Sequence, residues 1–316
     1  MNIAEFRNRE LRSSRMGDSI LARLSSVPTL GRAAHKAKLL ARRMFLWPLH
    51  ALRKSRLRKF GLARRSALSI AELRLVPDCP CPHGAHFVPL SWGAVKAFAR
   101  AGKPTARALT PTAMTIDLEQ FPDFASWRKR VSTLTQGKYH RSANKARRLG
   151  YTSRFVGTHS YERSLYELTG SKSRRSKGVL VWAAIAGPRS DLVDSKAPAP
   201  WPECPRHWRL NWGAFQADGS DERLAAFAML VRAGDLVWVQ SFIGHGAALT
   251  DGVTKMLMFD VMEWLLARRD PCAQGVRCLV HGSLEEGAVG LFDWKRYLAF
   301  KPTILKVVDH PQNARS

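Results

Sequence analysis

The sequence is short of cysteine, of acidic residues and of uninterrupted apolar stretches. Its cysteines are five in number, and they lie at Cys79, Cys81, Cys204, Cys272 and Cys278. An odd number of cysteines does not suit a disulfide framework, and we identify no secretory leader ahead of them. We therefore expect reduced thiols and a cytoplasmic protein.

Charged residues interrupt the longest apolar stretches of the chain. Arg232 and Asp235 break one such stretch, and Lys255 and Asp260 break another. A helix that crosses a bilayer needs about 20 consecutive, predominantly apolar residues. We therefore predict no transmembrane span, while peripheral attachment to a membrane surface stays open.

Acidic residues are too few to balance the basic ones. The chain has 51 Lys and Arg against 25 Asp and Glu, a formal net charge of +26. Residues 1–70 carry 17 basic and 3 acidic residues, residues 121–180 carry 14 and 3, and the rest of the chain is close to neutral. Two basic regions thus accompany an ordinary globular part, which indicates a polyanionic partner or an anionic surface.

The first basic region predicts an N-terminal arm over residues 1–76, partly helical or disordered. Within it, residues 31–60 mix Leu, Phe45 and Trp47 with many Lys and Arg and with no acidic residue. Such an amphipathic segment is typical of binding to an anionic membrane surface. It is also compatible with an arm packed on the domain or with binding to RNA. A linker at 77–111 and a domain at 112–310 follow in this prediction.

The linker contains zinc-binding residue types in the loop "PDCPCPHGAHFVPLS", namely Cys79, Cys81, His83 and His86. Their spacing is tighter than that of the usual zinc motifs, and the prolines between them stiffen the loop. We therefore expect a structural loop without a metal, and keep a zinc-stabilised module as the alternative.

Beyond the linker, the hydrophobic pattern alternates between helix and strand. It predicts a strand at 112–121, a helix at 122–150 interrupted near Thr135, a strand at 151–156 and a helix at 159–172. Three strands follow from "HWRLNWGAFQ" onward, the last two joined at 233–235. The helix "VTKMLMFDVMEWLLARR", capped by Thr250 or Asp251, is apolar almost all round and is predicted to be buried. A short strand, a short helix and a closing strand complete a mixed α/β fold.

The stretch "GKYHRSANKARRLGY" predicts a helix with a cationic stripe opposite a stripe of small residues. The helical period places four basic residues on one face: Lys138, Arg141, Lys145 and Arg148. The following loop adds Arg174 and Arg175. Together these side chains would clamp phosphate groups. The alternative is a cationic face that only water contacts.

Two segments resemble the GNAT-type N-acyltransferase superfamily and its Fem-type relatives. The segment "LFDWKRYLAFKP" is similar to the closing helix of GNAT-type enzymes and their entry to the last strand, with Ala299 where glycine is usual. The segment "RSANKARRLGY" resembles a pattern of Fem-type acyltransferases, which include enzymes that use aminoacyl-tRNA. The resemblance covers residues 112–308. It implies a GNAT-like mixed central sheet flanked by helices.

The resemblance also implies where an acyl donor would bind. GNAT-type enzymes hold the pyrophosphate of coenzyme A at the start of the central helix. The corresponding stretch here is "GHGAALTDGVTKML", which offers Gly246 and Gly252 but no basic residue at the usual place. Donor phosphates would then rest on the basic residues, Arg141, Lys145, Arg148, Arg174 and Arg175.

Three residues are candidates for proton transfer or for binding an acceptor. His245 lies between two glycines before the central helix, where it would take a proton from an amine. Tyr297 would act as a general acid, and Glu285 would bind an amine acceptor. The alternatives are a turn histidine, a tyrosine without a chemical role and a solvated carboxylate.

We therefore predict an acyltransferase that passes an acyl or aminoacyl group from acyl-CoA or aminoacyl-tRNA to an amine. We expect no tightly bound cofactor, with acyl-CoA as a co-substrate. The alternative is a non-catalytic binder of nucleic acid or anionic membrane on the same scaffold. Binding of that second kind weakens steeply with salt, because neutralised phosphates release their counterions.

Overall fold

The computed structural model of the chain describes residues 69–76, 79–81, 113–157, 160–172, 191–195, 200–218, 221–283 and 289–308. The chain divides into two compact units, Met1–Arg65 and Ser66–Ser316, and every described residue belongs to the second. The basic segment 31–60 lies outside the described residues, so its interpretation stays a prediction. No helix in the described part is long and apolar enough to span a bilayer.

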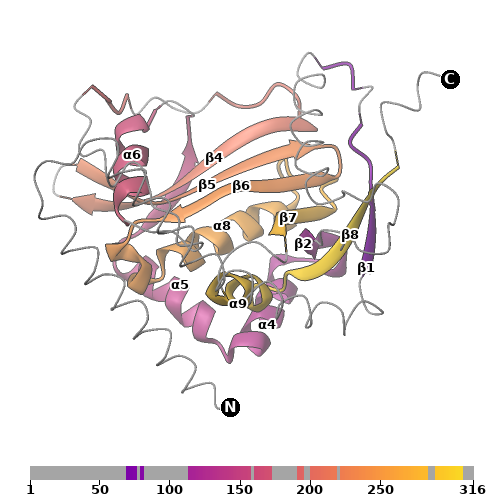
Figure 1. The fold of residues 1–316 in the computed structure, drawn as a ribbon, viewed down its shortest axis with the longest axis horizontal. Helices are drawn as coiled ribbons and strands as arrows, with labels where there is room; N and C mark the ends of the chain where they lie inside the picture. Colours follow the sequence, from indigo (N-terminus) through magenta and orange to yellow (C-terminus); the bar gives the residue numbers. More distant parts are fainter. Residues whose placement is uncertain are drawn as a thin grey trace, which may run out of the picture. The chain divides into compact units, whose positions relative to one another are not determined.

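The described residues form a mixed α/β fold around one eight-stranded sheet (Figure 1), which confirms the predicted fold class. The strands are β1 (Ser69–Leu73), β2 (Ala113–Asp117), β3 (Thr152–Val156), β4 (His207–Asp218), β5 (Asp221–Ala233), β6 (Leu236–Gly244), β7 (Cys278–Ser283) and β8 (Lys301–Val307). Their order in the sheet is β1-β8-β2-β7-β6-β5-β4-β3. Parallel pairing occurs between β1 and β8 and between β6 and β7.

The helices are α4 (Phe124–Thr135), α5 (Lys138–Arg148), α6 (Glu162–Gly170), α8 (Val253–Ala267) and α9 (Val289–Tyr297), with short 3-10 turns η2 (Leu118–Gln120) and η3 (Ala247–Asp251). In Figure 1, α8 lies directly against the strands β4 to β6, and α5 and α4 lie outside it. The sequence of long hairpin, buried helix, strand, helix and strand is the one expected from the GNAT resemblance.

Residue size along β5 separates the two faces of the sheet. Ala226 and Ala228 belong to the large core beneath α8, whereas Phe227 and Met229 pack in a second cluster with Leu168 of α6. Because successive side chains of a strand point to opposite faces, the alternation of alanine with larger residues lets α8 approach one face closely. The chain thus buries α8 almost completely, as its sequence predicted.

The predicted break in the helix at 122–150 occurs at Gln136 and Gly137. Both have left-handed backbone, with φ of 51° and 74°. Asp123 caps α4 by accepting a hydrogen bond from the backbone N–H of Ser126 at 2.7 Å. After the break, α5 turns the small face of Ala143 and Ala146 toward the core, where both are fully buried. The predicted small-residue stripe is therefore confirmed.

The start of α8 and the end of the N-terminal arm differ from the sequence prediction. The N-cap of α8 is Gly252, not Thr250 or Asp251, because those two residues belong to η3. Ser69–Leu73, which the prediction assigned to the end of the N-terminal arm, form the edge strand β1 beside β8. The division of the remaining chain at residues 76 and 111 stays a prediction.

Ala299 has an unusual backbone conformation at the end of α9. Its φ is 69°, in the left-handed region that favours glycine. Its N–H donates to the Arg296 carbonyl, and the Phe300 N–H donates to the Lys295 carbonyl, both at 3.1 Å. These bonds close the last turn of α9 and reverse the chain into β8. This is the physical reason for a glycine at this place in the motif.

We expect Ala299→Gly to raise the free energy of unfolding by about 0.5 kcal/mol, because relief of left-handed strain exceeds the added entropy of the unfolded chain. Urea denaturation measures the change. The same substitution at Ala267, which is exposed at the end of α8 with helical backbone, is the control and should cost about 1 kcal/mol. Equal losses at the two sites would contradict the strain at Ala299.

Candidate active site

The parallel strands β6 and β7 pair at one end only. Their register runs over three residue pairs, Leu236↔Cys278, Val237↔Leu279 and Trp238↔Val280. Beyond Trp238, β6 continues to Gly244 alongside β5, and its ladder with β7 stops. The backbone groups on that edge of β6 therefore leave the sheet ladder in the middle of the fold.

Both strands carry a register shift at this point. On β6, Leu230 of β5 faces Val239 while Met229 faces Ser241, so Gln240 is an extra residue. On β7, two residues, His281 and Gly282, stand opposite Met114 of β2. Gly282 has a φ of 61°. Such bulges bend a strand and redirect its side chains, and they are common beside active sites.

His281 is the first residue of β7 beyond the segment that pairs with β6. Its imidazole lies among aromatic rings, with ring centroids 6.1 Å from Phe242 of β6, 5.6 Å from Trp294 of α9 and 6.1 Å from Phe300. The ring centroids of Phe242 and Trp294 are 5.3 Å apart, so the two rings pack β6 against α9 beside the imidazole. We call these four residues the His281 cluster.

The charge at the His281 cluster is set by burial and by one lysine. Burial, and then the positive charge of Lys295, lower the pKa of His281 to about 3. The imidazole is therefore neutral at physiological pH. The Lys295 side chain itself is 1% exposed. A neutral imidazole near a buried cation can hold a polar group that develops negative charge, such as a carbonyl oxygen under attack.

The predicted catalytic residues take up different positions. His245 directly follows β6, and its Nδ1 accepts a hydrogen bond from the backbone N–H of Ala247 at 3.3 Å, which leaves the proton on Nε2. Tyr297 packs against Tyr139 of α5, with ring centroids 5.8 Å apart. Glu285 lies outside the described residues. The roles assigned to all three stay predictions.

The glycines expected to bind phosphate, Gly246 and Gly252, contact other parts of the protein closely. The N–H of Gly246 donates to Ser171 Oγ at 3.0 Å, and a Cβ at Gly246 would lie 2.8 Å from the Ser171 carbonyl oxygen. Gly252 has a φ of 90°, and a Cβ there would lie 2.2 Å from the Ser142 carbonyl oxygen. Gly252 therefore permits α5 to pack against the start of α8, where coenzyme A pyrophosphate was expected.

The four basic residues of the predicted stripe are all exposed on α5. Lys145 is paired across the helices, with its Nζ 3.1 Å from the Asp251 carboxylate and 3.2 Å from the Thr250 carbonyl oxygen. Arg174 and Arg175 lie outside the described residues, so their convergence with α5 stays a prediction.

Asp260 of α8 is paired with Arg147 of α5. The Arg147 guanidinium forms an ion pair with Asp260, whose other carboxylate oxygen accepts a hydrogen bond from Ser153 Oγ at 2.7 Å. A carboxylate on an almost fully buried helix needs partners of this kind, because an unpaired buried charge is costly. The ion pair ties α5 to α8 on the side that faces β3.

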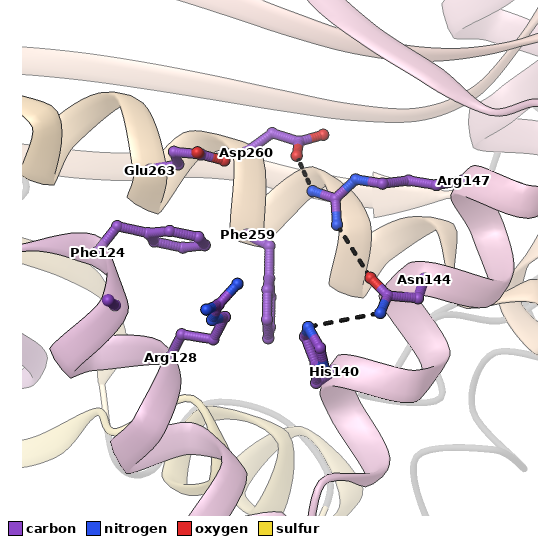
Figure 2. Close-up of a pocket in the computed structure, with 9 residues that line it drawn as sticks. Phe124, Arg128, His140, Asn144, Arg147, Phe259, Asp260 and Glu263 are labelled. Carbon is purple, nitrogen blue, oxygen red and sulfur yellow. Dashed lines mark hydrogen bonds and ion pairs between the residues drawn. The ribbon is translucent and has the colours of Figure 1, made fainter.

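A polar pocket of about 350 Å³ lies between α4, α5 and α8 (Figure 2). Figure 2 shows Arg147 between Asp260 and Asn144, and Asn144 next to His140. Two guanidinium groups and two carboxylates line the pocket, from Arg128, Arg147, Asp260 and Glu263. Because these charges balance, the pocket does not select for an anionic donor.

Sequence reasoning did not find His281 or Lys295. His281 ends the apolar run "VRCLVHG", and Lys295 lies in the closing motif "LFDWKRYLAFKP". A histidine within a short, otherwise apolar strand was an available signal. Its meaning depends on the register with β6 and β2, which the pattern of one strand does not contain.

No family model matches the chain, and no curated protein matches it. Solved structures do show similarity. The C-terminal domain of a putative lysylphosphatidylglycerol synthetase from Agrobacterium fabrum matches with a TM-score of 0.35 and 16% identity, over 60% of this chain and 57% of that one. L-PGS from Bacillus licheniformis matches with a TM-score of 0.32 and 13% identity, over 55% of this chain and 45% of that one.

A GCN5-related N-acetyltransferase from Kribbella flavida matches with a TM-score of 0.29 and 13% identity, over 61% of this chain and 54% of that one. This chain therefore spans about half the length of the solved structures that it matches. Similarity at these values identifies neither a reaction nor a substrate.

Proposed function

We propose that this protein is an acyltransferase and that the reaction takes place where β6 and β7 part. The observation that carries the proposal is the pair of register shifts, at Gln240 and at His281, on two parallel strands at the point where they separate. In this arrangement, backbone N–H groups of β6 beyond Trp238 do not bond to β7, and they lie beside a neutral imidazole. Such groups can bind a carbonyl oxygen without rearranging.

In the proposed reaction, an amine nitrogen attacks the carbonyl carbon of a thioester or an aminoacyl ester. A carbon–nitrogen bond forms, the carbon–sulfur or carbon–oxygen bond breaks, and the proton of the amine goes to the leaving group through a proton carrier. His281 is too weak a base to carry that proton, because its pKa lies at about 3. Its proposed role is to hold the carbonyl. His245 remains the candidate proton carrier, and its Nδ1 accepts the proton after it releases the Ala247 N–H.

The donor proposed for this site carries phosphate groups, as coenzyme A and tRNA do. The support for this is the net charge of +26 and the exposure of Lys138, Arg141 and Arg148 on α5. Arginine and lysine side chains of this kind bind phosphate oxygens with charge-assisted hydrogen bonds. Gly246 packs against Ser171, and Gly252 packs against Ser142. Side chains rather than a glycine loop would therefore provide most of the phosphate contacts.

Thermal unfolding with candidate donors tests the proposal at about 150 mM salt. The probes are acetyl-CoA, longer acyl-CoAs, free coenzyme A and an aminoacyl-tRNA, and binding of RNA and of anionic vesicles is measured beside them. A donor at about 100 times its dissociation constant should stabilise the protein by about 2.7 kcal/mol. Replacing Arg141 and Arg148 by glutamine should weaken donor binding about tenfold, and Arg163→Gln on α6 is the matched control.

The outcome separates the two function classes. Stabilisation by an acyl-CoA that exceeds the stabilisation by free coenzyme A, which carries the same phosphates, supports acyl transfer and identifies the donor. A shift with an aminoacyl-tRNA, and with no acyl-CoA, supports the same reaction with the other donor. If no donor shifts the melt, while RNA or anionic vesicles bind with a steep dependence on salt, the protein is a binder and the transferase proposal is wrong.

A further inference from the structure

Four ligand-type side chains meet at the end of the sheet where β6 begins, away from the His281 cluster. Cys79 and Cys81 follow β1, and Cys204 and His207 lie at the start of β4, about 125 residues further along the chain. Their three Sγ atoms and one imidazole nitrogen all lie within 4.8 Å of one another. Three sulfurs and one nitrogen form one of the common ligand sets of structural zinc.

Three of the six distances between these four atoms match the edges of a tetrahedron around one ion, and the other three are at most 4.8 Å. Sγ of Cys79 is 3.7 Å from Sγ of Cys204, and His207 Nδ1 is 3.4 Å from Sγ of Cys81 and 3.8 Å from Sγ of Cys204. Zinc binds sulfur at about 2.3 Å and nitrogen at about 2.0 Å, which gives edges of about 3.8 Å and 3.5 Å in a tetrahedron. The three distances agree with these edges within a few tenths of an ångström.

The neighbourhood of the four residues prepares them as ligands. His207 Nε2 lies 2.9 Å from the Leu75 carbonyl oxygen, and because a carbonyl only accepts, Nε2 carries the proton. The lone pair of Nδ1 therefore points toward the three sulfurs. The backbone N–H of Arg206 donates to Cys204 Sγ at 3.4 Å. Outer hydrogen bonds of both kinds orient and stabilise ligands at metal sites.

A buried guanidinium supplies positive charge beside the cluster. Arg232 is 3% exposed and donates to the Pro205 carbonyl at 2.8 Å, within the Cys204–His207 turn, and to the Cys272 carbonyl at 2.9 Å. A divalent ion with three thiolates and a neutral imidazole carries a net charge of −1. Burial of a cation is costly unless a negative charge accompanies it. The zinc ion together with its three thiolates would provide that negative charge beside Arg232.

A disulfide does not account for the cluster. The Sγ atoms of Cys79 and Cys204 are 3.7 Å apart, and all five cysteines are free thiols. A disulfide bond has a length of about 2.0 Å. Closing one would also leave Cys81 and His207 without a role at the same point.

We propose that Cys79, Cys81, Cys204 and His207 bind one zinc ion in a closed structural site. Four protein ligands leave no open position for substrate. The ion would fasten the segment after β1 to the start of β4. The site replaces the sequence expectation of a metal-free loop, and it uses Cys204 and His207 in place of His83 and His86, which lie outside the described residues. The proposal does not depend on the transferase activity.

Metal analysis of the full-length protein, purified under reducing conditions without chelator, is the first test. We expect about one zinc per chain, and an X-ray absorption spectrum with three sulfurs at about 2.3 Å and one nitrogen at about 2.0 Å. Cys204→Ser and His207→Ala should lose the metal. Cys272→Ser, which removes a buried thiol outside the cluster, and His83→Ala should keep it.

Cobalt titration of the metal-free wild type provides a second readout that does not require a variant to fold. Tetrahedral cobalt with three thiolates should give visible ligand-field bands and a thiolate charge-transfer band, and zinc should displace it. Failure of the reduced wild type to bind either metal would overturn the proposal. Retention of the metal by His207→Ala together with its loss in His83→Ala would also overturn the ligand set.

Discussion

Gly252→Ala is expected to lower the free energy of unfolding by about 3–4 kcal/mol, several times the effect of Gly150→Ala. Both glycines have left-handed backbone, with φ of 90° and 81°. A Cβ at Gly252 would lie 2.2 Å from the Ser142 carbonyl oxygen, whereas a Cβ at Gly150 would meet nothing within 4 Å. The left-handed strain is common to the two sites, so the difference isolates the contact between α5 and α8.

Urea denaturation of the two variants, monitored by tryptophan fluorescence, gives this difference directly. Gly150→Ala alone should cost about 1 kcal/mol, the cost of left-handed backbone for a residue with a Cβ. Equal effects at the two positions would mean that α5, which carries Ser142, moves away from Gly252 without loss of stability. In that case Gly252 would regain its earlier interpretation as a phosphate-binding glycine, and donor binding by Gly252→Ala would decide the point.

His281→Phe is expected to reduce acyl transfer about a thousandfold while the fold persists. Phenylalanine keeps an aromatic ring among Phe242, Trp294 and Phe300, so the packing of the cluster is retained. The substitution removes only the polar nitrogens. The measurement is the rate of amide formation from the donor identified by thermal unfolding, followed by mass spectrometry.

His245→Phe tests the other imidazole of the proposal, the candidate proton carrier that directly follows β6, and it should also slow the transfer. A large loss for His245→Phe and a normal rate for His281→Phe would place the chemistry at the predicted residue. Normal rates in both variants, with donor binding intact, would remove both imidazoles from the reaction.

His281→Phe should also change the response of the fold to acid. The pKa of His281 is lowered to about 3 in the folded protein, below the ordinary value of about 6.5. Between these pH values the unfolded chain binds a proton that the folded chain does not, so the stabilisation is complete above pH ~6.5 and is lost as pH falls toward ~3. From pH 7 to pH 4.5, the wild type should therefore lose about 2 kcal/mol more than the variant.

The sequence alone determined the elements whose cause is local. The helical spacing of Ala143 and Ala146 predicts a core-facing stripe of small residues, and both alanines are fully buried. The interruption of the long helix follows from Gln136 and Gly137, which leave the helical backbone region. The almost continuous apolar surface of α8 likewise required burial on all sides. In each case the periodicity of a short segment is sufficient.

Only the tertiary structure decided which residues meet. The sequence placed Cys79 and Cys81 beside His83 and His86 because they are neighbours in the chain, whereas the fold brings Cys204 and His207 to them. It also suggested His245, whose role stays a prediction, whereas the position of His281 depends on a register shift of β7 against β2 beside one of β6 against β5. Convergence of this kind depends on strand order and register, which single-segment patterns do not encode, because residues far apart in sequence become neighbours only through long-range pairing.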